Sequence, residues 1–309
     1  MSRYVEPRLR RDFGGILTAY FDFVRYNYKG LLNGFIAYNG IFIILTLISG
    51  YFFITNIIEY AVAQNNWVDG GVNSEAEALA AGFSIIFLFL VLGLATMFNY
   101  SIASSYVSVY ERDKINNIAR KKVWRTLVPK LGGMLLFIIS AVVLYFVYFV
   151  VNVVLAFIPI LGSLVSLLIA LGFNAWMSLT IFSYVHNKHS VFDAFGEAWS
   201  LLFSSFWKSI GVNFVMAFII QIVLFAMNLV PTVLMSIYIF NSVSDGGGIQ
   251  DDVVSQIFLV VMLAMFSVTF LLIQLFSQSV NGFLYFNLHE YRYNNYLRTR
   301  IEKLGASGE

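Results

Sequence analysis

The chain of 309 residues contains no cysteine, only four prolines and three histidines, and few charged residues. The absence of cysteine excludes disulfides, thiolate nucleophiles and cysteine-bound metal sites. Charged residues make up 12% of the chain and hydrophobic residues 59%, whereas about a quarter of the residues of a soluble protein are charged. A composition this poor in charge predicts an integral membrane protein.

Charge is missing altogether from five long segments, which are 31–58, 81–110, 131–185, 209–244 and 253–289. About 20 apolar residues cross the roughly 30 Å of hydrocarbon in a bilayer, and Pro159 and Gly162 divide the third segment near its middle. The sequence therefore predicts an all-α polytopic membrane protein with six transmembrane helices in a single integral membrane domain, residues 1–309. The predicted spans are approximately 33–58, 81–106, 133–157, 161–185, 210–240 and 253–286.

All 19 lysines and arginines fall on one side of this predicted topology. The connections 59–80, 157–162 and 241–252 contain none of them, while the whole segment before span one holds six, the segment 104–130 seven, the segment 186–208 two and the tail four. Positively charged loops stay in the cytoplasm. We therefore expect a multi-pass protein of the cell inner (cytoplasmic) membrane with both termini cytoplasmic. The same rule accounts for the basic face without nucleic acid, so the expected partners are the lipid bilayer and other membrane proteins.

Three segments that precede spans one, three and five have apolar residues at helical spacing but too many polar residues to cross a membrane. They are approximately 13–30, 115–130 and 191–206, and amphipathic helices of this kind lie in the membrane interface. The predicted interfacial anchors are Trp124, Trp199, Lys29, Lys130 and Lys208. Two interpretations are open: three repeats of one module, an interfacial helix followed by a membrane hairpin, or the general preference for aromatic and lysine side chains at interfaces.

The last span has no clear stop signal. No glycine or proline interrupts residues 283–304, so the pattern predicts one long helix that continues into the tail and ends at Gly305.

The predicted spans carry amides in place of charged side chains. A charge within the membrane would usually mark an ion or proton path, and its absence disfavours ion-coupled transport. Gln274, Gln278 and Asn281 follow i, i+4, i+7 spacing on one face of span six, and Asn174 and Asn213 lie in other spans. These five residues form a possible polar interior. They either line a cavity for a headgroup or peptide or, as we favour, hydrogen-bond between helices, which contributes about 0.6 kcal/mol per pair.

Catalytic and cofactor motifs are missing from the sequence. It has no nucleophilic triad pattern, no glycine-rich phosphate loop and no HExxH. His186, His189 and His289 could assemble a metal site only if spans four and six meet. We favour ordinary interfacial histidines, and expect no enzyme activity, no catalytic residue, no cofactor and no metal.

Several motifs resemble a known family. They are Phe21–Lys29 (FDFVRYNYK), Ala194–Trp199 (AFGEAW), Phe286–Glu290 (FNLHE) and Leu297–Gly305 (LRTRIEKLG). Together they resemble an uncharacterised six-span bacterial membrane protein family, which is similar in build to the membrane domain attached to some glycerophosphodiester phosphodiesterases. The resemblance covers nearly the whole chain, but the catalytic phosphodiesterase domain is absent, so that activity does not carry over. Families of this build often accompany other small membrane proteins and a MoxR-type ATPase.

These observations lead to one functional hypothesis and one alternative. The hypothesis is a non-enzymatic inner-membrane scaffold or assembly subunit of a membrane protein complex, possible partners including a complex linked to a MoxR-type ATPase. The alternative is a transporter or lipid-translocating membrane protein with an amide-lined interior.

Overall fold

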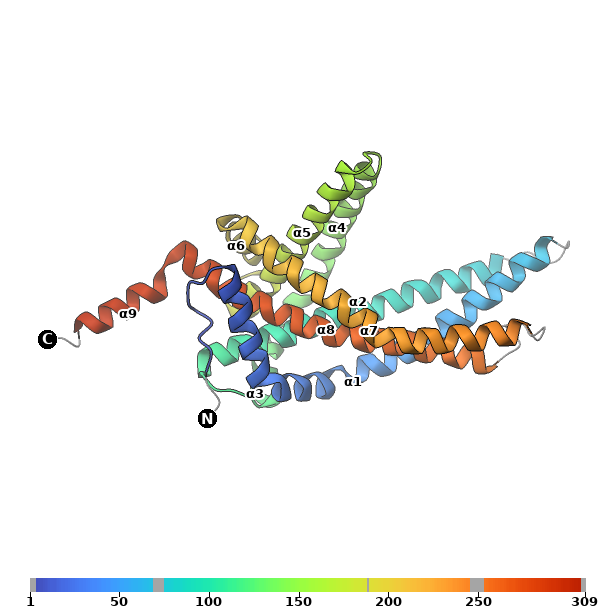
Figure 1. Cartoon of the computed structure of the whole chain (residues 1–309), viewed down its shortest axis with the longest axis horizontal. Coiled ribbons are helices and arrows are strands. Elements are labelled where there is room, and N and C mark those ends of the chain that lie inside the picture. Colours follow the sequence, from blue (N-terminus) through green and yellow to red (C-terminus); the bar gives the residue numbers. More distant parts are fainter. Residues whose placement is uncertain (1–3, 69–74, 188, 245–252, 307–309) are drawn as a thin grey trace. The chain divides into compact units, whose positions relative to one another are not determined.

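The computed structural model describes residues 4–68, 75–187, 189–244 and 253–306, and within them it contains helices and no strand. The predicted all-α class is therefore confirmed (Figure 1). The α-helices are α1 (Phe13–Val68), α2 (Glu75–Asp113), α3 (Arg120–Leu127), α4 (Leu131–Ala156), α5 (Leu161–His186), α6 (Val191–Ser204), α7 (Phe206–Ser244), α8 (Val253–Tyr293) and α9 (Asn295–Ala306), and a 3-10 turn at Val128–Lys130 joins α3 to α4.

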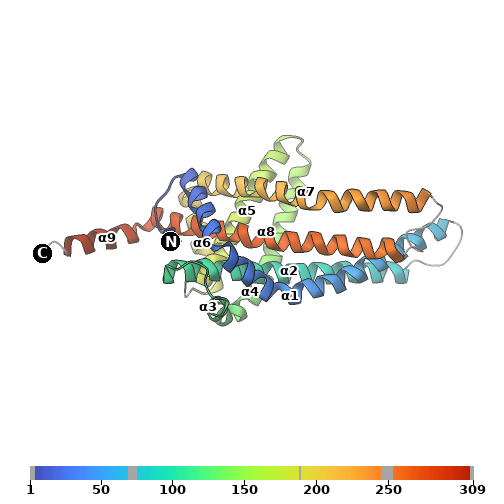
Figure 2. The ribbon, with the colours of Figure 1, turned by 60° about the horizontal axis from the view of Figure 1, so that its bottom comes forward.

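Six of these helices are long and apolar enough to cross a membrane, namely α1, α2, α4, α5, α7 and α8. The chain is therefore a multi-pass membrane protein. The predicted break in the third apolar segment is confirmed, because α4 ends at Ala156 and α5 begins at Leu161. Proline in this turn cannot continue the helix of α4. The two helices then run antiparallel as a hairpin (Figure 2).

The chain divides into two compact units. Unit 1 comprises Met1–Phe35, Asn99–Phe218 and Gln274–Glu309, and unit 2 comprises Ile36–Phe98 and Ile219–Ile273. Unit 2 contains segments of α1, α2, α7 and α8. Its helices contact through rings, such as Phe42 with Phe98 at 5.3 Å, and through the Asn56 amide, which donates to the backbone oxygen of Ala80 at 3.3 Å.

Unit 1 has an aromatic core. Phe23 of α1 is fully buried, and its ring centroid lies 4.7 Å from that of Tyr110 on α2 and 5.1 Å from that of Phe283 on α8. Tyr20, one turn earlier on α1, is also buried and donates its hydroxyl to the backbone oxygen of Phe276 at 2.8 Å. The apolar stripe of residues 13–30 thus packs partly against α2 and α8 of this unit.

The three predicted surface segments differ in how they join their spans. Residues 13–30 belong to the same continuous helix as span one, α1. The segment predicted at 115–130 begins only at Arg120, because Lys114 and Asn117 adopt positive φ angles of 53° and 51°. A non-glycine residue in that conformation interrupts a right-handed helix. The third segment, α6, ends at Ser204, close to the predicted end at residue 206.

The prediction of one unbroken helix through residues 283–304 is wrong. The chain breaks at Asn294, whose φ is 55°, between α8 and α9, and α9 then includes Gly305. Asparagine tolerates the left-handed conformation better than most residues. The Glu290 carboxylate accepts hydrogen bonds from the backbone N–H groups of Tyr296 and Leu297, both at 3.0 Å, and so caps the first turn of α9, whose N–H groups lack helical partners.

Candidate functional site

Three of the five predicted interior amides hydrogen-bond between helices of unit 1. Gln278 of α8 is fully buried. Its Nε2 donates to Ser104 Oγ on α2 and to the backbone oxygen of Ser178 on α5, both at 2.9 Å. Asn281 of α8 and Asn213 of α7 donate to each other's side-chain oxygens at 3.3 Å and 3.2 Å. One face of α8 therefore connects to three neighbouring helices through amides.

The other two amides lie outside this hydrogen-bonded set. Gln274 is 7% exposed, and its Oε1 has no hydrogen-bond partner among the described residues. Asn174 is half-buried on α5, one turn before Ser178. The structure thus brings Asn213 and Asn281 together, joins Gln278 to α2 and α5, and places Gln274 and Asn174 apart from these contacts.

A glycine lets α8 approach its neighbours closely at this level. A Cβ atom at Gly282 would lie 2.7 Å from a ring carbon of Phe182 on α5 and 2.8 Å from a methyl carbon of Val107 on α2. Side-chain atoms would have to move to accept it. Small residues allow close helix approach in membranes, and here the approach brings the amides of α8 within hydrogen-bonding reach of α2 and α5.

Lys130 joins the two ends of the α4–α5 hairpin. Its Nζ donates to the backbone oxygen of Asn187 at 2.5 Å and lies 4.7 Å from the ring centroid of Tyr184. The Tyr184 hydroxyl donates back to the Lys130 carbonyl at 3.0 Å. A Cβ at Gly133 would overlap that hydroxyl, so the glycine three residues after the lysine makes room for the tyrosine.

Lys208 occupies the corresponding position at the start of α7. Its Nζ lies 5.0 Å from the ring centroid of Tyr291 and donates to the Asn287 side chain at 3.4 Å. It also donates to the backbone oxygen of Arg11 at 3.1 Å. In both cases a lysine opening one span contacts an asparagine and a tyrosine at the end of the next span. The two contacts differ in kind, because Lys130 bonds the backbone oxygen of Asn187 and Lys208 the side-chain oxygen of Asn287, so they fit both repeated modules and the general preference of lysine and tyrosine for interfaces.

The remaining predicted anchors are more exposed. Lys29 lies 5.9 Å from the ring centroid of its neighbour Tyr28 and has no counterpart of the lysine–asparagine contact among the described residues. Trp199 is 51% exposed and its ring packs 5.2 Å from that of Trp176. Trp124 is 37% exposed. Exposed indoles of this kind suit a membrane interface, where one edge is apolar and the other is wet.

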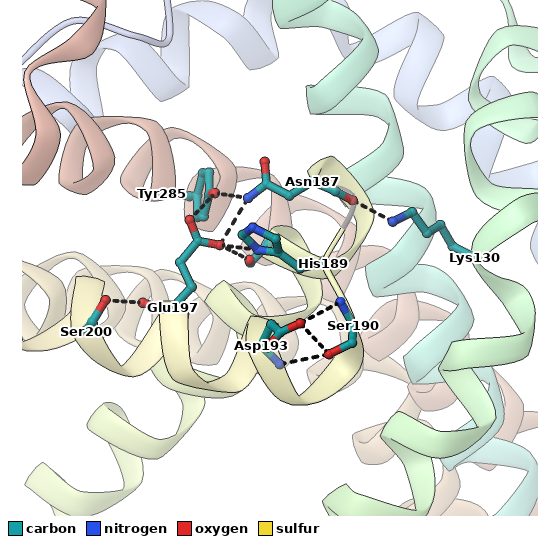
Figure 3. Close-up of polar contacts among 9 residues, drawn as sticks. Lys130, Asn187, His189, Ser190, Asp193, Glu197, Ser200 and Tyr285 are labelled. Carbon is teal, nitrogen blue, oxygen red and sulfur yellow. Dashed lines mark hydrogen bonds and ion pairs between the residues drawn. The ribbon is translucent and has the colours of Figure 1, made fainter.

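Glu197 of α6 forms a polar cluster that the sequence did not predict (Figure 3). Its Oε2 accepts hydrogen bonds from Ser183 Oγ on α5 and from Asn187 Nδ2 at 3.0 Å. Its Oε1 accepts from the Tyr285 hydroxyl on α8 at 3.1 Å. The Nδ1 atom of His189 lies 3.1 Å from Oε2. The carboxylate therefore ties α6 to α5 and α8, and both of its oxygens are engaged.

A capping box defines the first residue of α6. The Ser190 hydroxyl accepts the backbone N–H of Asp193 at 3.2 Å, and the Asp193 carboxylate accepts the backbone N–H of Ser190 at 3.3 Å, which makes a capping box. The hydrogen bonds from Ser190 hold the pKa of Asp193 below its usual value. This cap places Glu197 one turn further along the helix.

One sequence signal could have found Glu197. It lies three residues after Ala194 and four before Leu201, both of which are buried. An acid on the apolar stripe of an amphipathic helix is costly unless it is hydrogen-bonded. Its position therefore predicts polar partners on the facing helices.

The N-terminal arm, residues 4–12, lies across the ends of several helices of unit 1. Arg8 Nε lies 2.7 Å from Glu111 Oε1 on α2, and its guanidinium carbon lies 5.1 Å from the Phe286 ring centroid on α8. Arg8 also approaches His186 Nε2 of α5 at 3.4 Å, while His186 Nδ1 lies 3.2 Å from Ser108 Oγ. One arginine of the arm thus contacts three helices.

Further hydrogen bonds hold the arm along its length. The Asn287 amide donates to the backbone oxygens of Leu9 and Arg11, both at 3.1 Å. The Tyr110 hydroxyl accepts the backbone N–H of Val5 at 2.8 Å and donates to the backbone oxygen of Val5 at 3.1 Å. These contacts join residues far apart in the chain, so no local pattern predicts them.

The histidines that could have formed a metal site lie at the end of unit 1 where α5 and α8 meet. The ring centroid of His186 on α5 lies 6.0 Å from that of Tyr285 on α8, so spans four and six do meet at this end, and His289 lies one turn after Tyr285 on α8. The part of the chain that the structure describes nevertheless contains no group of three or more histidine or acidic side chains that could hold a metal ion.

Comparison with protein-family models, with curated proteins and with solved structures finds no match to this chain. The networks described above hold helices and the N-terminal arm in fixed positions, and their polar groups are largely engaged with one another.

Proposed function

We propose that the protein is a non-enzymatic scaffold or assembly subunit of a membrane protein complex in the inner membrane of a bacterium. The observation that carries the proposal is the pairing of the interior amides. Gln278 contacts α2 and α5, and Asn281 pairs with Asn213. Amides used in this way hold helices together. A rigid bundle of this kind suits a protein that other membrane proteins assemble upon.

The α4 helix offers a surface for such a partner. Its exposed side includes an aliphatic and aromatic stripe at alternating spacings of three and four residues, formed by Ile139, Val142, Phe146, Phe149 and Val153. Spacing of this kind is the pattern by which one helix packs its side chains between those of another. A transmembrane helix of a partner protein would fit along it.

The proposal is tested by isolating the full chain from its native membrane in mild detergent and identifying the proteins that come with it. Phe146→Ala, at a position 67% exposed, should reduce the recovery of a partner. Phe225→Ala, at a comparable position of α7 that is 65% exposed, serves as the matched control. Recovery of a MoxR-type ATPase would support the family resemblance. The proposal would be contradicted if the chain purified alone in every mild detergent and still performed its cellular role.

The proposed orientation places both termini in the cytoplasm, because all 19 basic residues lie on one side of the six spans. Reporters fused at residues 70 and 247, which lie outside the described residues, should behave as external. Fusions at residues 118 and 190 and at the C-terminus should behave as cytoplasmic. A cytoplasmic signal at residue 247 would overturn this topology.

A second candidate function, transport or lipid translocation, is favoured by one observation. The side-chain oxygens of Gln274 and Gln278 are buried and have no hydrogen-bond partner among the described residues, so they could contact a polar solute. A folded, normally abundant Gln278→Leu protein that has lost a transport activity would favour this candidate over the scaffold.

A further inference from the structure

A cavity lies in unit 1 between the N-terminal arm and the first turns of α1. Its volume is about 640 Å³, and Figure 1 shows the arm passing beside the start of α1. One wall is a stripe of α1 with spacings of three and four residues, which includes Thr18, Asp22 and Tyr26. The opposite wall comes from the arm. Small residues such as Ala19 keep the space between them open.

The charged groups that line the cavity favour a cation. Glu6 and Asp22 contribute carboxylates, and Arg11 contributes a guanidinium. The guanidinium is partly committed, because its Nη2 donates to the Glu6 backbone oxygen at 2.6 Å. The lining thus contains two carboxylates and one guanidinium, so its acidic groups outnumber its basic group. A ligand that carries several N–H donors and a positive charge would match it.

Two further atoms of the arm point to the same chemistry. Glu6 Oε1 and the Tyr4 hydroxyl are buried and have no hydrogen-bond partner among the described residues. Burial raises the pKa of Tyr4, so its hydroxyl stays neutral and can accept as well as donate. A buried acceptor without a partner costs stability, and a hydrogen-bond donor on a bound ligand would offset that cost.

We propose that this cavity binds a primary ammonium group borne next to a phosphate, the pattern of an ethanolamine phospholipid headgroup or of free phosphoethanolamine. The ammonium would hydrogen-bond Glu6 and Asp22, and the phosphate would face Arg11, whose guanidinium suits phosphate oxygens. Phe21, on the same helix, is 46% exposed. The interfacial position that the sequence predicts for residues 13–30 would put the cavity at headgroup depth, where a phospholipid headgroup could enter it.

The test measures lipid binding to the full-length protein in detergent micelles by native mass spectrometry. The two probes are dioleoylphosphatidylethanolamine and its choline counterpart, whose quaternary ammonium has no N–H to donate. We expect the ethanolamine lipid to bind about tenfold more tightly, as hydrogen bonds to charged groups imply. Asp22→Asn should remove most of this preference. Glu302→Gln makes the same carboxylate-to-amide change on exposed α9, outside the cavity, and should retain it.

A second variant keeps the test independent of the carboxylates. Thr18 is exposed and lines the cavity, so Thr18→Trp should occlude the space while the protein still folds. Its chromatographic profile and melting temperature should match those of the unchanged protein. Both probes should then bind equally to this variant. Glu6→Gln is less decisive, because Glu6 also accepts the Tyr296 hydroxyl at 3.0 Å and its loss could loosen the arm.

Competition separates the two sources of the ligand. If millimolar phosphoethanolamine displaces the ethanolamine lipid, the cavity accepts the soluble compound. If it does not, the lipid is the ligand and its acyl chains contribute to binding. Equal affinity of the unchanged protein for the two lipids, or a preference that survives both Asp22→Asn and Thr18→Trp, would overturn the proposal.

Discussion

Gln274 and Gln278 lie one turn apart on α8, and replacing each with leucine should have different consequences. Gln278→Leu removes two hydrogen bonds, to Ser104 on α2 and to the Ser178 carbonyl on α5. At about 0.6 kcal/mol for each interhelical bond, the expected loss of stability is about 1 kcal/mol. Gln274→Leu removes no hydrogen bond to another described residue and takes away a buried oxygen without a partner. Its expected effect is near zero or slightly stabilising.

The free energy of unfolding can be measured for both variants by reversible unfolding in mixed micelles with increasing dodecyl sulfate. A double-mutant cycle with Ser104→Ala isolates one of the two bonds, and we expect a coupling of about 0.6 kcal/mol between Gln278 and Ser104. If Gln274→Leu is as destabilising as Gln278→Leu, or if the coupling to Ser104 is zero, the assignment of these amides to helix packing is wrong. The two substitutions are chemically identical and both side chains are buried, so lipid-facing hydrophobicity cannot explain a difference.

Three other substitutions test the contacts at the ends of the helices. Gly133→Ala should lower the melting temperature because its Cβ would lie 2.5 Å from the Tyr184 Cζ carbon and would also overlap the hydroxyl; Tyr184→Phe in the same chain should recover only part of the loss because the ring remains, and an unchanged melting temperature in Gly133→Ala would refute the clash. Ser190→Ala removes the cap of α6 and should cost about 1 kcal/mol, seen as faster hydrogen exchange in the first turn of α6 and unchanged exchange in α9. Glu197→Ala leaves several donors on α5 and α8 without their acceptor and should cost about 1–3 kcal/mol, measured in the same unfolding titration; a neutral result would show that this cluster does not hold α6.

The sequence alone determined the secondary-structure class and the number of spans, because both depend on local composition. A span needs only a long run without charge, and the ring of Pro159 cannot continue α4, which ends at Ala156. The stripe of Gln274, Gln278 and Asn281 could also be predicted, since helical periodicity places side chains seven residues apart on one face. The sequence showed that a lysine recurs at the start of spans three and five, but it did not show that Lys130 and Lys208 contact the ends of α5 and α8.

The tertiary structure decided which of these side chains meet. Gln278 reaches Ser104 and Ser178 because Gly282 lets α8 approach α2 and α5, while Gln274, on the same stripe, makes no such contact. The Glu197 cluster and the contacts of the N-terminal arm depend on partners distant in the chain, and the break at Asn294 became visible only with the cap that follows it. Glu290 caps α9 across that break. Hydrogen bonds between residues far apart in sequence follow from packing of the whole unit, and no local pattern specifies them.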